Sequence, residues 1–259
     1  MIVENAVLAI VLSLLGILVL VAVHLFVPRM KILEREAGPW ISASAGVAIA
    51  YVFVDVMPLL ARQQSTMMAA DPAGWLGFLE HHAYLVALAG FAFHYGIALS
   101  RTADAGMAAS TGGLVRGGLG SRFSLISLLI YAFLIGYMIG EKWDHDYQPG
   151  LLFALAMAVH FIGRNHLAYE QAPDAYKRWL RFELAAVTLA GWLLAILTRV
   201  SDLVFFLAIS FLAGGIIVVA MSVELPRIRA NSTDFLAFNG GLVGFSILLL
   251  VAEYFRDLG

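Results

Sequence analysis

The chain has 259 residues, of which 61% are hydrophobic and only 13% are charged, and its net charge is −2. A soluble domain carries about 25% charged residues, so this composition excludes a water-soluble protein and indicates a polytopic membrane protein. A net charge this small gives no reason to expect a nucleic-acid partner. The sequence has no cysteine, which excludes disulfides, thiolate metal ligands and cysteine nucleophiles.

Eight apolar segments are long enough to cross a bilayer, for which about 20 residues are needed. The predicted spans are 5–27, 40–60, 82–100, 122–141, 150–169, 180–198, 202–223 and 234–255. The N-terminus lacks the positive region of a signal peptide, so we expect the first span to be a retained helix. The connector 101–121 combines glycines with Ala, Ser and Thr, and we expect a flexible cytoplasmic loop within one transmembrane domain over residues 1–259.

The basic residues predict the orientation of these spans. Alternate connectors carry eleven Lys and Arg residues on one side and four on the other, with Arg164 left inside a span. Cytoplasmic connectors are the ones enriched in Lys and Arg, so both termini are predicted to lie on the outer face. We expect a plasma or inner membrane, with the lipid bilayer as the first partner.

The sequence also contains an internal similarity. Gly46 precedes Pro58 by twelve residues, and Gly214 precedes Pro226 by the same interval. Each of these segments is followed by a span with a Gly-Phe pair, at 90–91 and at 244–245. Since the two segments would run in opposite directions, the pattern predicts an inverted repeat of spans 1–3 and 6–8, with two spans between them. Such repeats are typical of secondary transporters, whose sites lie near the midplane.

The fifth span contains the motif His160-Phe-Ile-Gly-Arg164-Asn165-His166. Ionisable groups inside a bilayer are costly, so such a cluster is by default a candidate functional site. His160 and Arg164 are four residues apart and share a helix face. Two interpretations stay open: a binding or relay group that faces the bundle interior, or a structural ion pair in which Glu183 of the next span neutralises Arg164.

These features resemble the ZIP family of divalent-metal transporters, across nearly the whole chain. Residues 45–58 are similar to the second span of that family, in which a histidine usually stands at the position of Asp55. Residues 211–226 are similar to its seventh span. The resemblance implies an all-α membrane protein of eight helices in a 3+2+3 arrangement. It also implies a divalent metal such as zinc or iron as substrate, with no other cofactor.

The metal-site motifs of the family are largely lost. Its fourth span carries His-Asn-x-x-(Asp/Glu)-Gly-x-x-x-Gly, and this chain keeps Gly136 and Gly140 but has Tyr131, Ala132 and Ile135 in place of the three ligand types. In the fifth span the family has His-x-x-x-Glu. His160 matches this histidine and is the one candidate metal ligand, whereas Arg164 replaces the acid. We therefore expect a degenerate site without a tightly bound divalent ion.

Two functions remain open on the sequence. The first is a transporter that moves a metal cation or another small solute through a midplane site. The second is a non-transporting membrane scaffold, sensor or partner subunit that keeps the fold. An enzyme is not expected, because seven scattered histidines do not form the histidine boxes of membrane metalloenzymes. A homodimer is a further expectation. The candidate pathway residues are His160, Arg164, Asn165, Tyr131, Asp55 and Glu183.

Overall fold

The computed structural model describes residues 2–62, 83–110, 119–141, 147–198, 202–224 and 232–257, and every regular element in these ranges is helical. The all-α prediction is therefore confirmed for this part of the chain. Eight of the described helices have 17 or more residues: α1 (Ile2–Phe26), α2 (Lys31–Tyr51), α5 (Ala83–Ser110), α6 (Leu119–Glu141), α7 (Tyr147–Gln171), α9 (Arg181–Leu197), α10 (Asp202–Val218) and α11 (Ser232–Asp257).

Six of the helical segments are long and apolar enough to cross a membrane, so the chain is an integral membrane protein. They are Val7–Arg29, Ala37–Arg62, Gly150–Gln171, Pro173–Leu197, Leu203–Met221 and Ser232–Phe255. The predicted spans 82–100 and 122–141 are also helical, but their described apolar stretches are shorter, at Tyr84–Ser100 and Leu125–Glu141. The prediction of eight spans is thus met in part, with eight helices of which six satisfy the length and hydropathy that a bilayer demands.

Two boundaries differ from the sequence prediction. Helix α5 continues to Ser110 and α6 begins at Leu119, so helix replaces most of the described part of the predicted loop 101–121. Residues 101–110 are rich in alanine, the strongest helix former, and this outweighs the single Gly106. The second helix begins at Lys31 rather than near residue 40 and includes Pro39. Residues 111–118 lie outside the described part.

Short irregular helices interrupt the long ones. A 3₁₀ turn, η1 (Val27–Arg29), ends α1, and α8 (Pro173–Ala175) with the π-helical η3 (Tyr176–Leu180) leads into α9. Two further π-helical segments are η2 (Val52–Val56) and η4 (Val219–Glu224). In η2 the N–H of Met57 donates to the carbonyl of Val52, a wider turn than in an α-helix, directly before Pro58. Such insertions occur frequently at functional sites.

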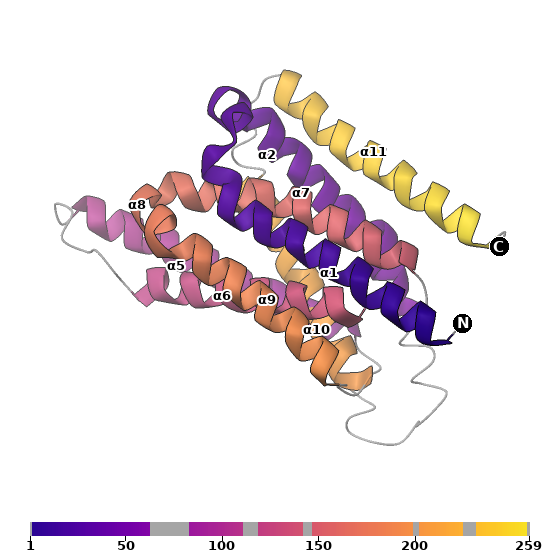
Figure 1. Ribbon diagram of the computed structural model, residues 1–259. Coiled ribbons are helices and arrows are strands. Elements are labelled where there is room, and N and C mark those ends of the chain that lie inside the picture. Colours follow the sequence, from indigo (N-terminus) through magenta and orange to yellow (C-terminus); the bar gives the residue numbers. More distant parts are fainter. Residues whose placement is uncertain are drawn as a thin grey trace.

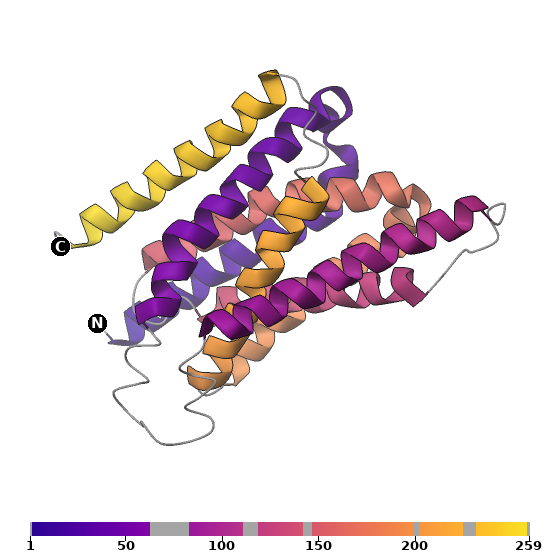
Figure 2. The same ribbon diagram turned by 180° about the vertical axis from the view of Figure 1, so that it is seen from behind.

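Three helix pairs surround a central helix. α2 packs along α11, α5 along α10, and α6 along α9, while α7 lies between α1 and α2 (Figure 1). Figure 2 shows the α5–α10 side from behind, where the two helices cross next to α6. Helix α11 contacts α2 and otherwise presents large apolar side chains outward, as expected of a face that meets lipid.

Glycines bring the paired helices into backbone contact. Gly46 of α2 lies directly against the carbonyl of Phe238 in α11, and a β-carbon there would collide with it. From the other side of this pair, Gly241 of α11 lies against the carbonyl of Ala43. Small residues at these positions let the backbones approach, which is the usual way that helices associate in a bilayer.

The α5–α10 pair has the same construction. Gly214 of α10 lies against the carbonyl of Ala87 in α5, and Gly90 of α5 lies against the carbonyl of Phe211. In each pair, both glycines stand three residues after the carbonyl that the partner helix's glycine contacts. Gly46 follows Ala43 and Gly241 follows Phe238 in the first pair. Gly90 follows Ala87 and Gly214 follows Phe211 in the second. The α6–α9 pair has this register too, since Gly136 lies against the carbonyl of Thr188 and Gly191 against that of Phe133.

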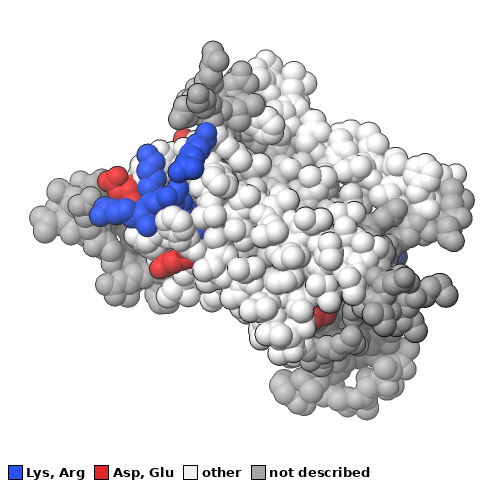
Figure 3. Space-filling model, viewed as in Figure 1, with Lys and Arg blue, Asp and Glu red and all other residues white. Residues whose placement is uncertain are grey.

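Four of the six Lys and Arg side chains that the structure describes gather at one end of the bundle. Arg29, Lys177 and Arg178 are exposed and Arg181 is half-buried; these four residues are called the basic patch. Figure 3 shows this patch at the end where α8 lies, opposite the end that carries the N- and C-termini in Figure 1. Most of the described surface between the two ends is free of charge in this view. The N- and C-termini lie at the same end of the bundle, as expected for an even number of spans.

Candidate functional site

Helices α6 and α7 meet at a tyrosine–histidine pair. The hydroxyl of Tyr131 lies 3.1 Å from Nε2 of His160, and their side chains are 2% and 0% exposed. The two rings meet edge to face, with centroids 6.0 Å apart. The phenol can donate to Nε2 or accept from an Nε2–H, so this hydrogen bond can form with either neutral imidazole tautomer. The two positions are those that the resemblance places at metal ligands, and the fold brings them together.

A second histidine, His94 of α5, extends this pair. Its ring lies 6.2 Å from the ring of Tyr131, again edge to face. Nδ1 of His94 donates to the carbonyl of Gly90, 2.8 Å away, which fixes the tautomer with the proton on Nδ1. The ring lies against Gly215 of α10, where a β-carbon would come within 2.7 Å of the imidazole. His94 is not among the candidate residues selected from the sequence, because nothing in its local pattern indicates its proximity to Tyr131.

Arg164 provides the charge at this centre. It follows His160 by one turn of α7 and is half-buried. Its guanidinium interacts electrostatically with the imidazoles of both His94 and His160. The side chain of Glu183 is exposed at the first turn of α9, and α9 packs against α6 and α1. A solvent- or headgroup-facing carboxylate does not fit the predicted buried ion pair with Arg164.

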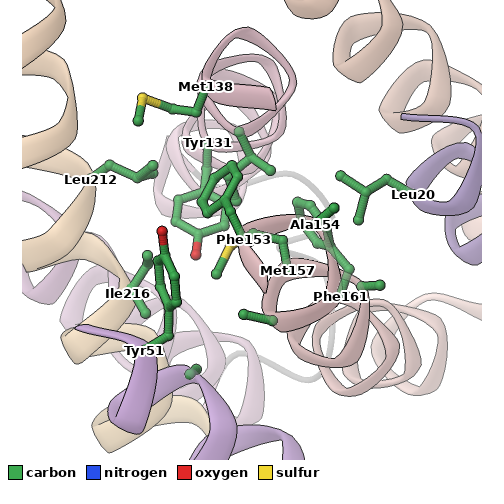
Figure 4. Packing of buried hydrophobic residues seen from close by; sticks show 14 of the residues in the cluster. Leu20, Tyr51, Tyr131, Met138, Phe153, Ala154, Met157, Phe161, Leu212 and Ile216 are labelled. Atoms are coloured by element: carbon green, nitrogen blue, oxygen red, sulfur yellow. The ribbon is translucent and has the colours of Figure 1, made fainter. Parts of the chain in front are cut away.

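Tyr51 and Asp55 approach the same centre from α2 and η2. Tyr51 is 1% exposed, its hydroxyl hydrogen-bonds the carboxylate of Asp55, and its ring lies 5.5 Å from that of Phe153. In Figure 4 the hydroxyls of Tyr51 and Tyr131 point into the same central region of the buried cluster. Asp55 is half-buried, on the π-helical segment that precedes Pro58. The candidate residues Tyr131, His160, Arg164 and Asp55 thus come from three helices around one centre.

Asn165 belongs to a different network. It follows His160 by five positions, which turns it by about 140° around the helix, away from the Tyr131 side. Its Nδ2 donates to Nδ1 of His24 in α1 at 2.9 Å, and Nε2 of His24 lies 3.1 Å from the hydroxyl of Thr188 in α9. The sequence prediction grouped Asn165 with His160, whereas the structure places the two residues on opposite sides of α7.

The hydrogen bonds of this second network are mutually consistent. The hydroxyl of Thr188 donates to the carbonyl of Leu184 at 2.7 Å, so it accepts from Nε2–H of His24. Nδ1 of His24 then carries no proton and accepts from Asn165. All three side chains are fully buried. The sequence analysis did not select His24; the signal was a histidine within an apolar span, which needs a polar partner in a bilayer.

The donor set at the centre is poor in metal ligands. Within the described ranges, no three His, Asp or Glu side chains converge on one point. What converges there is imidazole, phenol, one guanidinium and the carboxylate of Asp55. These groups offer hydrogen-bond donors, one fixed positive charge and one carboxylate to any solute that reaches them.

The chain was compared with protein-family models and with curated proteins, and neither comparison gave a match. The likeness to ZIP transporters therefore depends on the motifs and glycine spacings given above. The geometry establishes an integral membrane protein with two buried polar networks, one on each side of α7.

Proposed function

We propose that this chain is a ZIP-like membrane transporter that moves a metal cation or another small solute past the Tyr131–His160 pair. The observation that carries the proposal is the convergence of Tyr131, His160, His94 and Arg164 on one buried centre between α5, α6 and α7. Polar and charged groups in the middle of a membrane bundle are expensive to keep, and they are typical of substrate and ion pathways.

We propose an inverted repeat, which would fit a transporter architecture. If the α2–α11 and α5–α10 pairs are its equivalent parts, their glycine contacts pair Gly46 with Gly214 and Gly90 with Gly241, three residues earlier than the pairing with Gly244 predicted from the sequence. In Figure 2, α2 and α10 run in opposite directions, and so do α5 and α11. A rotation about an axis in the membrane plane would then exchange the α2–α11 pair with the α5–α10 pair.

Two of the three described π-helical segments, η2 and η4, fit the same register. Shifted by the interval between Gly46 and Gly214, η2 (Val52–Val56) falls on η4 (Val219–Glu224) to within one residue. Irregular helix turns near the middle of each half are a feature of transporters with inverted repeats, whose binding sites lie at the interface between the halves. Tyr51 and Asp55 are on or next to one of these turns, which connects the turn to the central site.

The charge of the site bears on the substrate. Arg164 stands where the resemblance places an acid. At about 6 Å and an effective dielectric near 20, a fixed positive charge opposes a second unit charge by roughly 3 kcal/mol and a divalent ion by about twice that. We therefore propose that any metal passes through without being held tightly in the ZIP-type central site.

A specific observation favours the alternative, a non-transporting scaffold or sensor. The centre is densely packed: Tyr131, Phe153, Met157 and Phe161 are each 2% exposed or less, and Figure 4 shows them interleaved with aliphatic side chains. A solute could reach His160 only if these side chains moved.

Accessibility of the centre distinguishes the two functions. The chain has no native cysteine, so His160→Cys or Tyr131→Cys can be labelled selectively. A transporter should allow a small polar thiol reagent to reach either cysteine from water, while Thr188→Cys, buried in the second network on the other side of α7, should stay unreactive. Protection of all three cysteines would favour the scaffold.

Uptake gives the direct test. Proteoliposomes with the wild-type chain are incubated in turn with divalent metals, monovalent cations and small anions in the outside medium. Uptake above that of empty liposomes, lost in His160→Ala and kept in Ser246→Ala, would support the proposal. Calorimetry with zinc would add a second measurement: tight stoichiometric binding by the wild type, lost on His160→Ala, would overturn the proposal of a degenerate site. The triple variant Tyr131→His, Ile135→Glu, Arg164→Glu should gain zinc affinity.

We further propose that the basic patch faces the cytoplasm and that both termini face outward. Four of the predicted cytoplasmic residues meet at one end, opposite the termini. Val3→Cys and Ser110→Cys should be labelled from opposite sides in oriented vesicles, and labelling from one side would refute this orientation.

A further inference from the structure

The basic patch has features of a binding site beyond its charge. Arg181 is half-buried, and its Nη1 reaches the carbonyl of Leu25 in α1 at 3.5 Å, the outer limit of a hydrogen bond. Its Nε is buried and has no hydrogen-bond partner among the described residues. A guanidinium carries five N–H donors, so Arg181 is held at the last turn of α1 with donor capacity left over.

Arg29 lies at the same turn. It belongs to η1, directly after α1, and its guanidinium stands 5.7 Å from the ring centroid of Phe26. Tyr176 ties the start of η3 to this turn, because its hydroxyl donates to the carbonyl of His24 at 3.0 Å. Arg29 and Arg181 therefore flank the C-terminal end of α1 from two different segments, and Lys177 and Arg178 are exposed on the adjoining η3.

Exposed aromatic residues alternate with these cations. Phe26 is 48% exposed, Trp179 39% and Phe182 50%. The ring of Phe182 lies 4.5 Å from the guanidinium carbon of Arg181. Below the patch, the outer faces of α1 and α9 present apolar side chains such as Leu18, Val19 and Leu189. Aromatic rings mark the headgroup level of a bilayer, and the aliphatic faces below it meet the acyl chains.

The nearby carboxylates reduce this positive charge without cancelling it. Asp174 of α8 and Glu183 of α9 are both exposed. Glu183 follows Arg181 by two positions and points to the other side of the helix, by about 200°. Asp174 stands one turn before Arg178. The described part of this end thus carries four basic side chains against three acidic ones, the third being Glu170, which lies 3.3 Å from Nε2 of His166.

From this arrangement we infer that the basic patch binds the headgroup phosphate of an anionic phospholipid. The phosphate oxygens accept from Arg181 and Arg29, Lys177 and Arg178 supply further positive charge, and the acyl chains lie along α1 and α9. Basic pockets between helix ends at the cytoplasmic surface are the usual site of such binding. An anionic lipid is the best match because the donors lie at headgroup level directly above an apolar face.

The test uses the full chain, purified and delipidated. Retention of phosphatidylglycerol and of phosphatidylcholine is measured by native mass spectrometry over a titration. The wild type should prefer phosphatidylglycerol. The double variant Lys177→Gln, Arg178→Gln should weaken its binding by roughly fivefold for each charge removed, the factor that corresponds to about 1 kcal/mol per basic residue near an anionic surface. Arg62 follows η2 and lies at the opposite end of the bundle, where it pairs with Glu253. Arg62→Gln is therefore the matched control and should leave binding unchanged.

Arg181→Gln should weaken binding at least as much as either single exchange in η3. Because Arg181 also contacts α1, the folding of this variant is checked by circular dichroism and by its elution profile. The Lys177 and Arg178 exchanges are at exposed positions and keep the test valid if Arg181→Gln misfolds. Equal binding of the two lipids, or an equal loss in Arg62→Gln, would overturn the inference. So would displacement of phosphatidylglycerol by inorganic phosphate at comparable concentration, which would assign the patch to a soluble anion.

Discussion

The buried network of His24, Asn165 and Thr188 makes a quantitative prediction about stability. In His24→Leu, Asn165 keeps its amide N–H in a dry interior without an acceptor, and the hydroxyl of Thr188 loses the N–H that it accepts. Because Thr188 still donates to Leu184, its loss is small. The main cost is therefore the amide of Asn165.

The magnitude follows from comparable bonds. A hydrogen bond between membrane helices contributes about 0.6 kcal/mol on average and up to about 1.7. A buried polar group left without a partner costs roughly 1–3 kcal/mol. Since all three side chains are fully buried, we expect His24→Leu to lower the free energy of unfolding by about 2–3 kcal/mol. The double variant His24→Leu, Asn165→Leu removes both partners and should recover at least half of that loss.

The assay is reversible unfolding of the full chain in mixed micelles, followed by circular dichroism as the denaturing detergent is increased. Ser246→Ala is the control, since that hydroxyl bonds only a carbonyl of its own helix, and its stability should change by less than about 0.5 kcal/mol. If the losses of His24→Leu and Asn165→Leu simply add in the double variant, the two residues are not coupled and the described network is wrong.

Three further predictions concern packing, charge and the central pair. Gly136 of α6 lies against the carbonyl of Thr188, so Gly136→Val should lower the free energy of unfolding by more than about 3 kcal/mol. A β-carbon at Gly96 would meet no atom within 4 Å, so Gly96→Ala should be neutral or stabilising in the same unfolding assay. Arg62, which follows η2, and Glu253 of α11 form an exposed ion pair at 3.0 Å. Glu253→Gln should lower the free energy of unfolding by less than about 1 kcal/mol, and a larger loss would mean that the pair is shielded from solvent. Tyr131→Phe should change the ¹⁵N shift of His160 and leave that of His24 unaltered; shifts in both would contradict the separation of the two networks.

Much of the fold could be predicted because long apolar runs have few alternatives in a bilayer, where every backbone group must be bonded within the segment. The helix limits were less predictable where local composition is ambiguous. Residues 101–110 contain both helix-forming alanines and a glycine, and only the structure decides between helix and loop. The π-helical turns η2 and η4 were not predicted, although Pro58 and Pro226 follow them in the sequence. A proline signals a lost hydrogen bond and not how the helix accommodates it.

The candidate site was predicted unevenly for geometric reasons. Tyr131 and His160 were selected together because the resemblance aligned both spans with one site, and the two side chains do meet. Asn165 was included because of its closeness in sequence, which means little on a helix, where five positions lead to another face. His24 and His94 could not be linked to partners because their contacts depend on how α1 and α5 are placed by tertiary packing.

The π-helical turn η2 affects what the centre can offer a solute. Pro58 has no N–H, so it cannot donate to the carbonyl of Val54 as the next residue of an α-helix would. Where a transporter helix is irregular, its backbone carbonyls supply ligands that side chains lack. The centre combines donors from Arg164, Tyr131 and the imidazoles with one acceptor, the carboxylate of Asp55 on η2. A small solute with both a negative and a positive end would match this combination better than a bare divalent ion, because Arg164 opposes the ion whereas it attracts the negative end. A zwitterionic probe in the uptake panel would test this directly, and transport of divalent metals with no uptake of any zwitterion would show that Arg164 does not face the path.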